Sequence, residues 1–286
     1  MKLRDRIAGM NSHYRYYTLE DFFQRLEQNG ICRAELWTCA SHFRLDERGW
    51  QATGPVKALA RAHGVELICL TPEQNNPKPY NLAARDPELI RMTCKYFTNA
   101  IRAAQELECP MVGVSSGWSF YSEPAEEGWK RSAAMLHALA EEAAGRGVTL
   151  VMESLLPRET RLVNTLERAR RMLQEVASPG LKANLDLGSM AAAGESVQRW
   201  FDTLGADVVH CHFVDGRPAG HLAWGSGDRD PGADLDAFRR NGYGGYFTLE
   251  LLAADYYERP WEADAQSLRT LAPWLDLDMG PTGRTA

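Results

Sequence analysis

The chain has 286 residues, of which 44% are hydrophobic and 24% are charged. A chain of this length can bury a large core without staples, and this charged fraction is ordinary for a soluble protein. Its 32 basic and 38 acidic residues give a net charge of -6, which argues against nucleic acid as a partner because an acidic chain gains nothing from counterion release. No apolar run approaches membrane-spanning length and no signal peptide precedes the first strand pattern, so we expect a cytoplasmic protein without a membrane partner.

Short apolar runs alternate with longer amphipathic stretches along the chain. The first run, 7–10, is followed by 19–28, where apolar residues recur at helical spacing and Thr18 is a suitable N-cap. Further strands are predicted at 34–37, 66–70, 111–115, 149–153, 181–187, 208–214 and 246–251, and the main helices at 87–107, 126–146 and about 261–275. Strands that alternate with helices form a parallel sheet.

Eight strand–helix units in a chain of this size predict one α/β domain, a (β/α)8 TIM barrel over residues 1–275. Residues 276–286 are expected to form a flexible C-terminal tail. A doubly wound open sheet would require a glycine-rich phosphate loop after an early strand, and neither GxGxxG nor GxxxxGK[ST] occurs. The active site of a barrel lies at the carboxyl ends of its strands, so polar residues at those ends are the candidates for function.

Four of the last predicted strands end in residues that bind metals: Glu153, Asp186, His212 and Glu250. Burying such groups singly costs several kcal/mol, and a shared divalent cation would offset that cost. Three carboxylates and one imidazole suit Mn2+, Co2+ or Mg2+, with Mn2+ as the expected ion. A thiolate zinc site is not expected, because none of the six cysteines forms a CxxC pair.

Other polar and aromatic residues follow the same strand ends and are candidates for substrate binding. His210 lies two residues before His212, so both side chains face the same side of their strand, and the spacing leaves open which of them is the ligand. The remaining candidates are Trp37, His42, Glu73, Glu159, Arg217 and His221. Simple packing is the alternative for the first two, and a surface salt bridge is the alternative for Arg217.

With these motifs the chain resembles the xylose isomerase-like barrel superfamily of sugar isomerases and epimerases, above all the fructoselysine 3-epimerases and other ketose 3-epimerases. The resemblance covers nearly the whole chain. Its most specific stretches are LTPEQN at 70–75 with PYN at 79–81, MESLLPRE at 152–159 and GYGGY at 242–246 before Glu250. The four strand-end residues match the metal quartet of that family. Many ketose epimerases carry a histidine two residues after the strand-six Asp, whereas this chain has Gly188.

The resemblance implies proton transfer at the carbon next to a ketone, through an enediolate that a divalent cation stabilises. Glu153 and Glu250 would be the two catalytic bases, one on each face of the substrate, which is a small sugar or sugar-amine. An inosose dehydratase or isomerase, or another sugar-phosphate isomerase, would use the same barrel and metal. A non-catalytic sugar-binding barrel would not need both glutamates, and an endonuclease would need more histidines. The assembly expected from the resemblance is a homodimer or a homotetramer.

Overall fold

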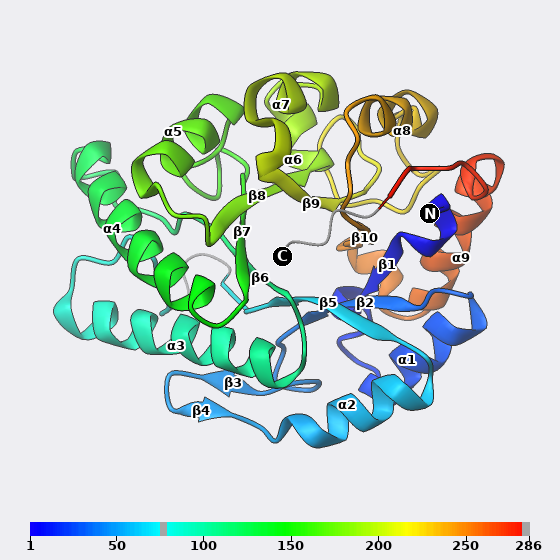
Figure 1. Ribbon diagram of the computed structural model, residues 1–286, viewed down its shortest axis with the longest axis horizontal. Coiled ribbons are helices and arrows are strands. Elements are labelled where there is room, and N and C mark those ends of the chain that lie inside the picture. Colours follow the sequence, from blue (N-terminus) through cyan, green and yellow to red (C-terminus); the bar gives the residue numbers. More distant parts are fainter. Residues whose placement is uncertain (75–78, 282–286) are drawn as a thin grey trace.

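The computed structural model describes residues 1–74 and 79–281. Within them, parallel strands close into a barrel in the order β1-β10-β9-β8-β7-β6-β5-β2, with helices around it (Figure 1). The strands are β1 (Ile7–Met10), β2 (Arg33–Trp37), β5 (Glu66–Thr71), β6 (Met111–Val114), β7 (Thr149–Glu153), β8 (Leu181–Asp186), β9 (Val208–His212) and β10 (Phe247–Leu249). The predicted TIM barrel is confirmed.

Helices connect successive barrel strands and cover the outside of the barrel (Figure 1). They are α1 (Leu19–Gln28), α2 (Thr53–Ala62), α3 (Pro87–Glu106), α4 (Ala125–Ala144), α5 (Leu166–Val176), α6 (Leu187–Ala192), α7 (Val197–Leu204), α8 (Pro231–Arg240) and α9 (Pro260–Leu271). As predicted, Thr18 caps α1: its hydroxyl accepts the backbone N–H of Asp21, and the Asp21 carboxylate accepts the N–H of Thr18. A short hairpin of β3 (Leu45–Asp46) and β4 (Gly49–Trp50) precedes α2.

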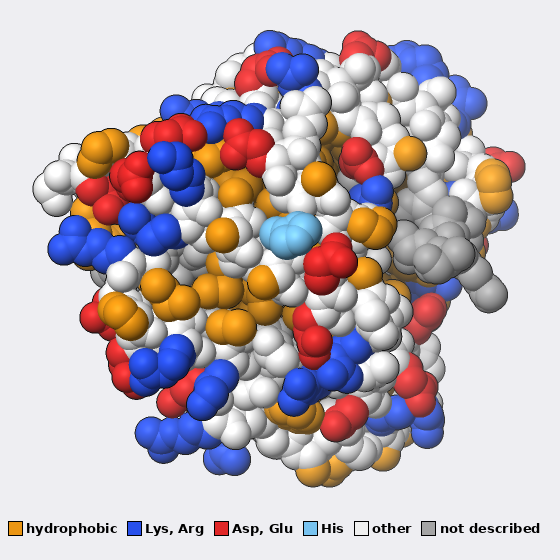
Figure 2. Space-filling model, turned by 60° about the vertical axis from the view of Figure 1, so that its left-hand side comes forward, with side chains coloured by type: hydrophobic (Ala, Val, Ile, Leu, Met, Phe, Trp, Pro, Cys, Tyr) orange, Lys and Arg blue, Asp and Glu red, His pale blue; other side chains and the backbone are white. Residues whose placement is uncertain are grey.

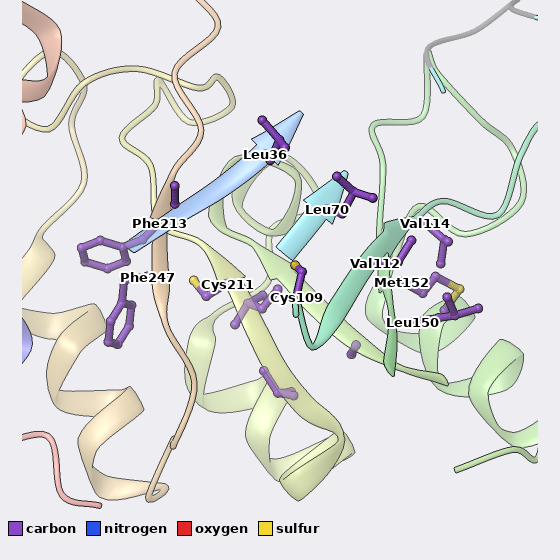
Figure 3. Packing of buried hydrophobic residues seen from close by; sticks show 14 of the residues in the cluster. Leu36, Leu70, Cys109, Val112, Val114, Leu150, Met152, Cys211, Phe213 and Phe247 are labelled. Atoms are coloured by element: carbon purple, nitrogen blue, oxygen red, sulfur yellow. The ribbon is translucent and has the colours of Figure 1, made fainter. Parts of the chain in front are cut away.

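The buried apolar side chains form two groups. The larger group fills the layer between strands and helices, and Figure 3 shows part of it, from Leu36 of β2 to Phe247 of β10. Cys211 belongs to this outer layer, as expected for a residue between two inward-facing histidines. The smaller group lies together within the barrel strands and consists of Ala8, Ile68, Cys69, Met111 and Val151, with Val209 and Tyr246 packed against it. We call this smaller group the apolar plug.

The end of the chain differs from the sequence-based expectation over residues 276–281, which were assigned to a flexible tail. Residue 278 forms an antiparallel bridge with Lys2, and the Arg6 guanidinium donates to the carbonyl oxygens of Met279, Gly280 and Pro281. Met279 is almost fully buried. A buried arginine needs acceptors for its donors, and this segment supplies them. The rest of the predicted tail, 282–286, lies outside the described residues, as does the Asn75 end of the motif at 70–75.

Figure 2 shows one face of the molecular surface. Basic and acidic side chains are intermixed there, among smaller hydrophobic areas. No helix in the described part of the chain is long and apolar enough to cross a bilayer.

Candidate metal centre

The four predicted metal ligands meet at the mouth of the barrel. Glu153, Asp186 and His212 are the last residues of β7, β8 and β9, and Glu250 directly follows β10. One ligand atom from each lies within 4.8 Å of the others. The Nδ1 atom of His212 is central, at 2.9 Å from Glu250 Oε2, 3.1 Å from Glu153 Oε1 and 3.8 Å from Asp186 Oδ2. The convergence expected from adjacent parallel strands is therefore present in the structure.

Asp186 is oriented by the helix that follows it. Its Oδ1 atom accepts the backbone N–H of Ser189 at 2.6 Å and caps the amino end of α6. The capping bond leaves Oδ2 to point into the cluster, 3.0 Å from Nε2 of His221. The carboxylate is fully buried, so its direction is set by these two contacts.

The charges of the cluster shift the pKa values of its members strongly. Burial disfavours protonation of His212, but the carboxylates of Glu250, Glu35 and Glu153 outweigh it and raise the pKa of the imidazole well above its usual value. Burial also raises the pKa of Glu153 to about 7, against the opposing effect of His212. For Glu250, His212 and His221 outweigh burial and lower the pKa to about 2. The buried carboxylates of the site therefore outnumber the positive charges beside them, and this excess of negative charge favours a bound cation or proton.

This donor set fits a divalent cation. Such ions bind carboxylate oxygens and imidazole nitrogens at about 2.0–2.6 Å, so two ligand atoms on opposite sides of an ion lie at most about 5 Å apart. The observed limit of 4.8 Å satisfies this condition without any change of backbone. Three carboxylates and one imidazole form the oxygen-rich set that hard ions prefer.

A fifth side chain, His221, reaches the same cluster from the loop after β9. Its Nε2 atom lies 3.0 Å from Asp186 Oδ2 and 3.1 Å from Glu250 Oε2. The loop is closed by two backbone hydrogen bonds between Asp215 and Leu222. The Asp215 carboxylate also accepts four backbone N–H groups, those of residues 216, 225, 227 and 229. A well-braced loop therefore presents His221 to the carboxylate cluster.

Gly188 makes room for this loop. A Cβ atom at position 188 would lie 2.5 Å from the carbonyl oxygen of Gly220 and 3.3 Å from Oδ1 of Asp186. Any larger side chain would therefore push against the residue that precedes His221. The glycine that replaces a histidine of many ketose epimerases thus lies directly beneath the loop that carries His221.

A family model, described as the xylose isomerase-like TIM barrel, matches residues 23–271 of the chain. The chain belongs to this family. It is 29% identical over 262 residues to the fructoselysine 3-epimerase of Shigella flexneri, a match that covers 91% of this chain and 94% of that one. The expected family and barrel are therefore confirmed.

Two solved structures have the same fold. The D-psicose 3-epimerase of Clostridium cellulolyticum H10, solved with D-tagatose, has a TM-score of 0.76 at 16% identity, with 93% of this chain and 97% of that chain covered. The IOLI protein, solved with a zinc atom, has a TM-score of 0.75 at 18% identity, with 94% and 98% covered. At these identities the likeness concerns the barrel alone.

The barrel also contains a buried carboxylate that the sequence analysis missed. Glu35 lies inside β2 and is 1% exposed. It accepts hydrogen bonds from His210 Nε2 at 2.6 Å, His212 Nε2 at 3.2 Å and the hydroxyl of Thr71 at 2.5 Å. The only signal in the sequence is a glutamate between Ala34 and Leu36, two residues that are fully buried.

His210 does not reach the open side of the site. Its ring is fully buried, Nε2 is bound to Glu35, and Nδ1 has no partner among the described residues. Of the two histidines, His212 faces the carboxylate cluster and His210 lies behind it on Glu35, a placement that favours His212 as the ligand. The structure does not bring His210 to a substrate position.

The early-strand candidates differ in their placement. Both ring nitrogens of His42 are used inside the protein, Nδ1 with the Asn11 side chain at 2.7 Å and Nε2 with the Tyr17 carbonyl at 2.8 Å. His42 is almost buried, so it braces the loop after β1 and is not brought to the metal ligands. Trp37 is partly exposed at the end of β2, where the Arg15 guanidinium lies 4.9 Å from its ring centre.

The other predicted substrate contacts lie farther out on the loops. Glu73 is partly buried, and its backbone N–H donates to the Thr38 hydroxyl. Glu159 is exposed, and its carboxylate accepts the N–H of Leu156. Arg217 is 64% exposed and pairs with Asp228 at 3.7 Å, the surface contact that was the alternative to substrate binding. Of the predicted substrate residues, the structure thus brings His221 into contact with the metal cluster.

Proposed function

We propose that the chain is a metal-dependent ketose 3-epimerase in which Glu153 and Glu250 carry protons to and from the carbon next to the ketone. The observation that supports this most directly is the difference in exposure within the cluster. The side chains of Glu153 and Glu250 are 19% and 12% exposed, whereas those of Asp186 and His212 are 0% and 2% exposed. A substrate that enters through the mouth can contact the two glutamates. Asp186 and His212 are out of its reach and serve only to bind the ion.

The two glutamates approach the same point from different strands. Glu153 ends β7 and Glu250 follows β10, strands that lie on either side of β8 and β9 in the barrel, and both glutamates contact Nδ1 of His212. One glutamate removes the proton from one face of the carbon, which yields an enediolate. The other returns a proton to the opposite face, and the centre is inverted. The chemistry that a divalent ion supplies here is stabilisation of the negative charge that develops on oxygen.

His221 completes this set on the open side. Its ring is 17% exposed, and its Nε2 atom lies within hydrogen-bond distance of Asp186 and Glu250. With a ketose bound, its Nε2–H is placed to donate to a substrate oxygen beside Glu250. The family relationship to fructoselysine 3-epimerase supports a ketose or an amine-linked ketose as the substrate.

Mn2+ is the ion we propose, with Co2+ and Mg2+ as alternatives, because the set is dominated by carboxylates. The zinc atom in the IOLI structure makes zinc the necessary comparison in a metal titration. All six cysteines are unpaired, which supports a reducing cytoplasmic location. A homodimer or homotetramer is proposed from the family relationship, and light scattering after gel filtration will decide it.

The test is proton exchange in deuterated water. The metal-loaded protein is incubated with ketoses, ketose-amines and inososes, and NMR identifies the carbon that gains deuterium. The expected result is deuterium at carbon 3 of a ketose or ketose-amine, together with its epimer. Loss of water from an inosose, with no exchange in any ketose, would replace the epimerase with a dehydratase.

A further inference from the structure

The carboxylate of Glu35 is buried in the barrel directly behind the proposed metal ligands. It accepts three hydrogen bonds, from His210 Nε2, His212 Nε2 and the Thr71 hydroxyl. An ionised carboxylate in such a place is costly unless it is fully hydrogen-bonded. Of the four proposed metal ligands, Glu35 contacts His212.

The contact with Glu35 determines which nitrogen of His212 faces the cluster. A carboxylate accepts protons only, so Nε2 of His212 must carry its proton toward Glu35. Nδ1, the atom within 3.1 Å of oxygens from Glu153 and Glu250, is the nitrogen that gives up its proton when a cation binds, and its lone pair then faces the cluster. The Asn184 amide nitrogen, 3.2 Å from Nε2, lies along the edge of the same ring.

We propose that Glu35 is a positioning residue of the metal centre: it holds His212 with Nε2 protonated and Nδ1 turned to the ion, while His210 and Thr71 hold Glu35. This inference rests on the metal centre of the proposed function and is independent of the substrate. Carboxylates behind a ligating histidine fix its tautomer and its orientation, and their removal lowers metal affinity about 10–100-fold.

The same residues suggest an alternative, a second metal site made of Glu35, Cys69 and His210, whose donor atoms also lie within 4.8 Å of one another. Hydrogen bonds occupy this position in the structure. Both oxygens of Glu35 already accept from a histidine, and the Cys69 thiol lies 3.6 Å from the Thr71 hydroxyl. A cation there would have to displace these donors, so the positioning role accounts for the contacts with fewer changes.

The experiment compares metal binding in the wild type, E35Q and C69A by calorimetry with Mn2+ and by the visible absorption of Co2+. Gln keeps the size of Glu35, but an NH2 group replaces one of the two oxygens, so one of the two imidazoles loses its acceptor. We expect one ion per wild-type chain, an affinity 10–100-fold lower in E35Q and an unchanged affinity in C69A. C69A is the matched control, since Cys69 is buried in the same layer and has no hydrogen bond to His212.

The tautomer is measured separately on the zinc-loaded wild type by nitrogen-15 NMR of the histidine rings, which decides the matter even if E35Q does not fold. The expected spectrum shows His212 protonated at Nε2 and metal-bound at Nδ1. Coordination through Nε2, or wild-type affinity in a folded E35Q, overturns the proposal. Two ions per chain, with the second lost in C69A, would make Glu35 a ligand instead. None of these measurements uses a substrate, so their interpretation does not depend on the outcome of the epimerase assay.

Discussion

Replacing Gly188 with alanine tests whether the packing of one loop sets the position of His221. The added Cβ atom would lie 2.5 Å from the Gly220 carbonyl oxygen, whereas ordinary contact begins near 3.4 Å. The obstacle is backbone, which cannot rotate away like a side chain. The loop must therefore retreat by about 0.9 Å at the residue before His221.

A displacement of this size is large for a catalytic group. His221 Nε2 lies 3.0 and 3.1 Å from its two carboxylate partners, so the shift would break both hydrogen bonds. Misplacement by about 1 Å costs about 100-fold in rate, or roughly 2.7 kcal/mol of barrier. Crowding of the loop should also lower the free energy of unfolding by about 1–3 kcal/mol.

The assay is kcat/KM for deuterium exchange, with thermal unfolding measured in parallel. The control is G54A in α2, because a Cβ atom there meets nothing within 4 Å. G54A should keep the wild-type rate, while G188A should lose about 100-fold of it. A G188A protein with both the rate and the melting midpoint of the wild type would show that the loop adapts freely, and the reasoning would be refuted.

Chelation should abolish exchange, and Mn2+ or Co2+ should restore it and raise the melting midpoint; full activity after rigorous metal removal would contradict the proposed centre. E250Q should lose epimerisation by at least about 100-fold while exchange from the Glu153 face persists at a reduced rate, and loss of neither would exclude a two-base mechanism. Metal affinity should rise between about pH 5 and pH 8. Before the ion binds, His212 and Glu153 have raised pKa values and hold protons that the ion must displace. A calorimetric affinity that does not change with pH would contradict this. H42A should destabilise the fold by about 1–3 kcal/mol yet leave KM unchanged, since His42 braces a loop; a raised KM at unchanged stability would return it to the substrate site.

The barrel and the quartet could be predicted because both depend on local patterns. An apolar run that ends in a carboxylate or histidine is visible in the sequence, and parallel strands place such ends on one rim. Glu153, Asp186, His212 and Glu250 each follow this pattern, and the structure brings them together. The identity of the bound ion and of the sugar is not contained in that pattern.

Residues whose roles depend on distant partners could not be predicted. Glu35 lies next to a shift of register between β2 and β5, and its partners are 36 to 177 positions away in the chain. The bracing role of His42 is not visible in the sequence, because its partner, the Tyr17 carbonyl, lies on another loop. Arg217 was assigned to the substrate, and its pairing with Asp228 depends on the fold of the loop. In each case the polar side chain is visible in the sequence, but its partner is not.

The apolar plug separates the polar residues at the mouth from the opposite end of the barrel. Its members, among them Ala8, Met111 and Val151, are almost completely buried and carry no titratable group apart from the Cys69 thiol, the pKa of which burial raises well above its usual value. We therefore expect protons and solvent to reach the glutamates from the mouth of the barrel. Engineering can treat the two ends of the barrel as separate tasks: substrate range can be varied at the mouth loops, and thermal tolerance can be raised by repacking below the plug without redesign of the chemistry.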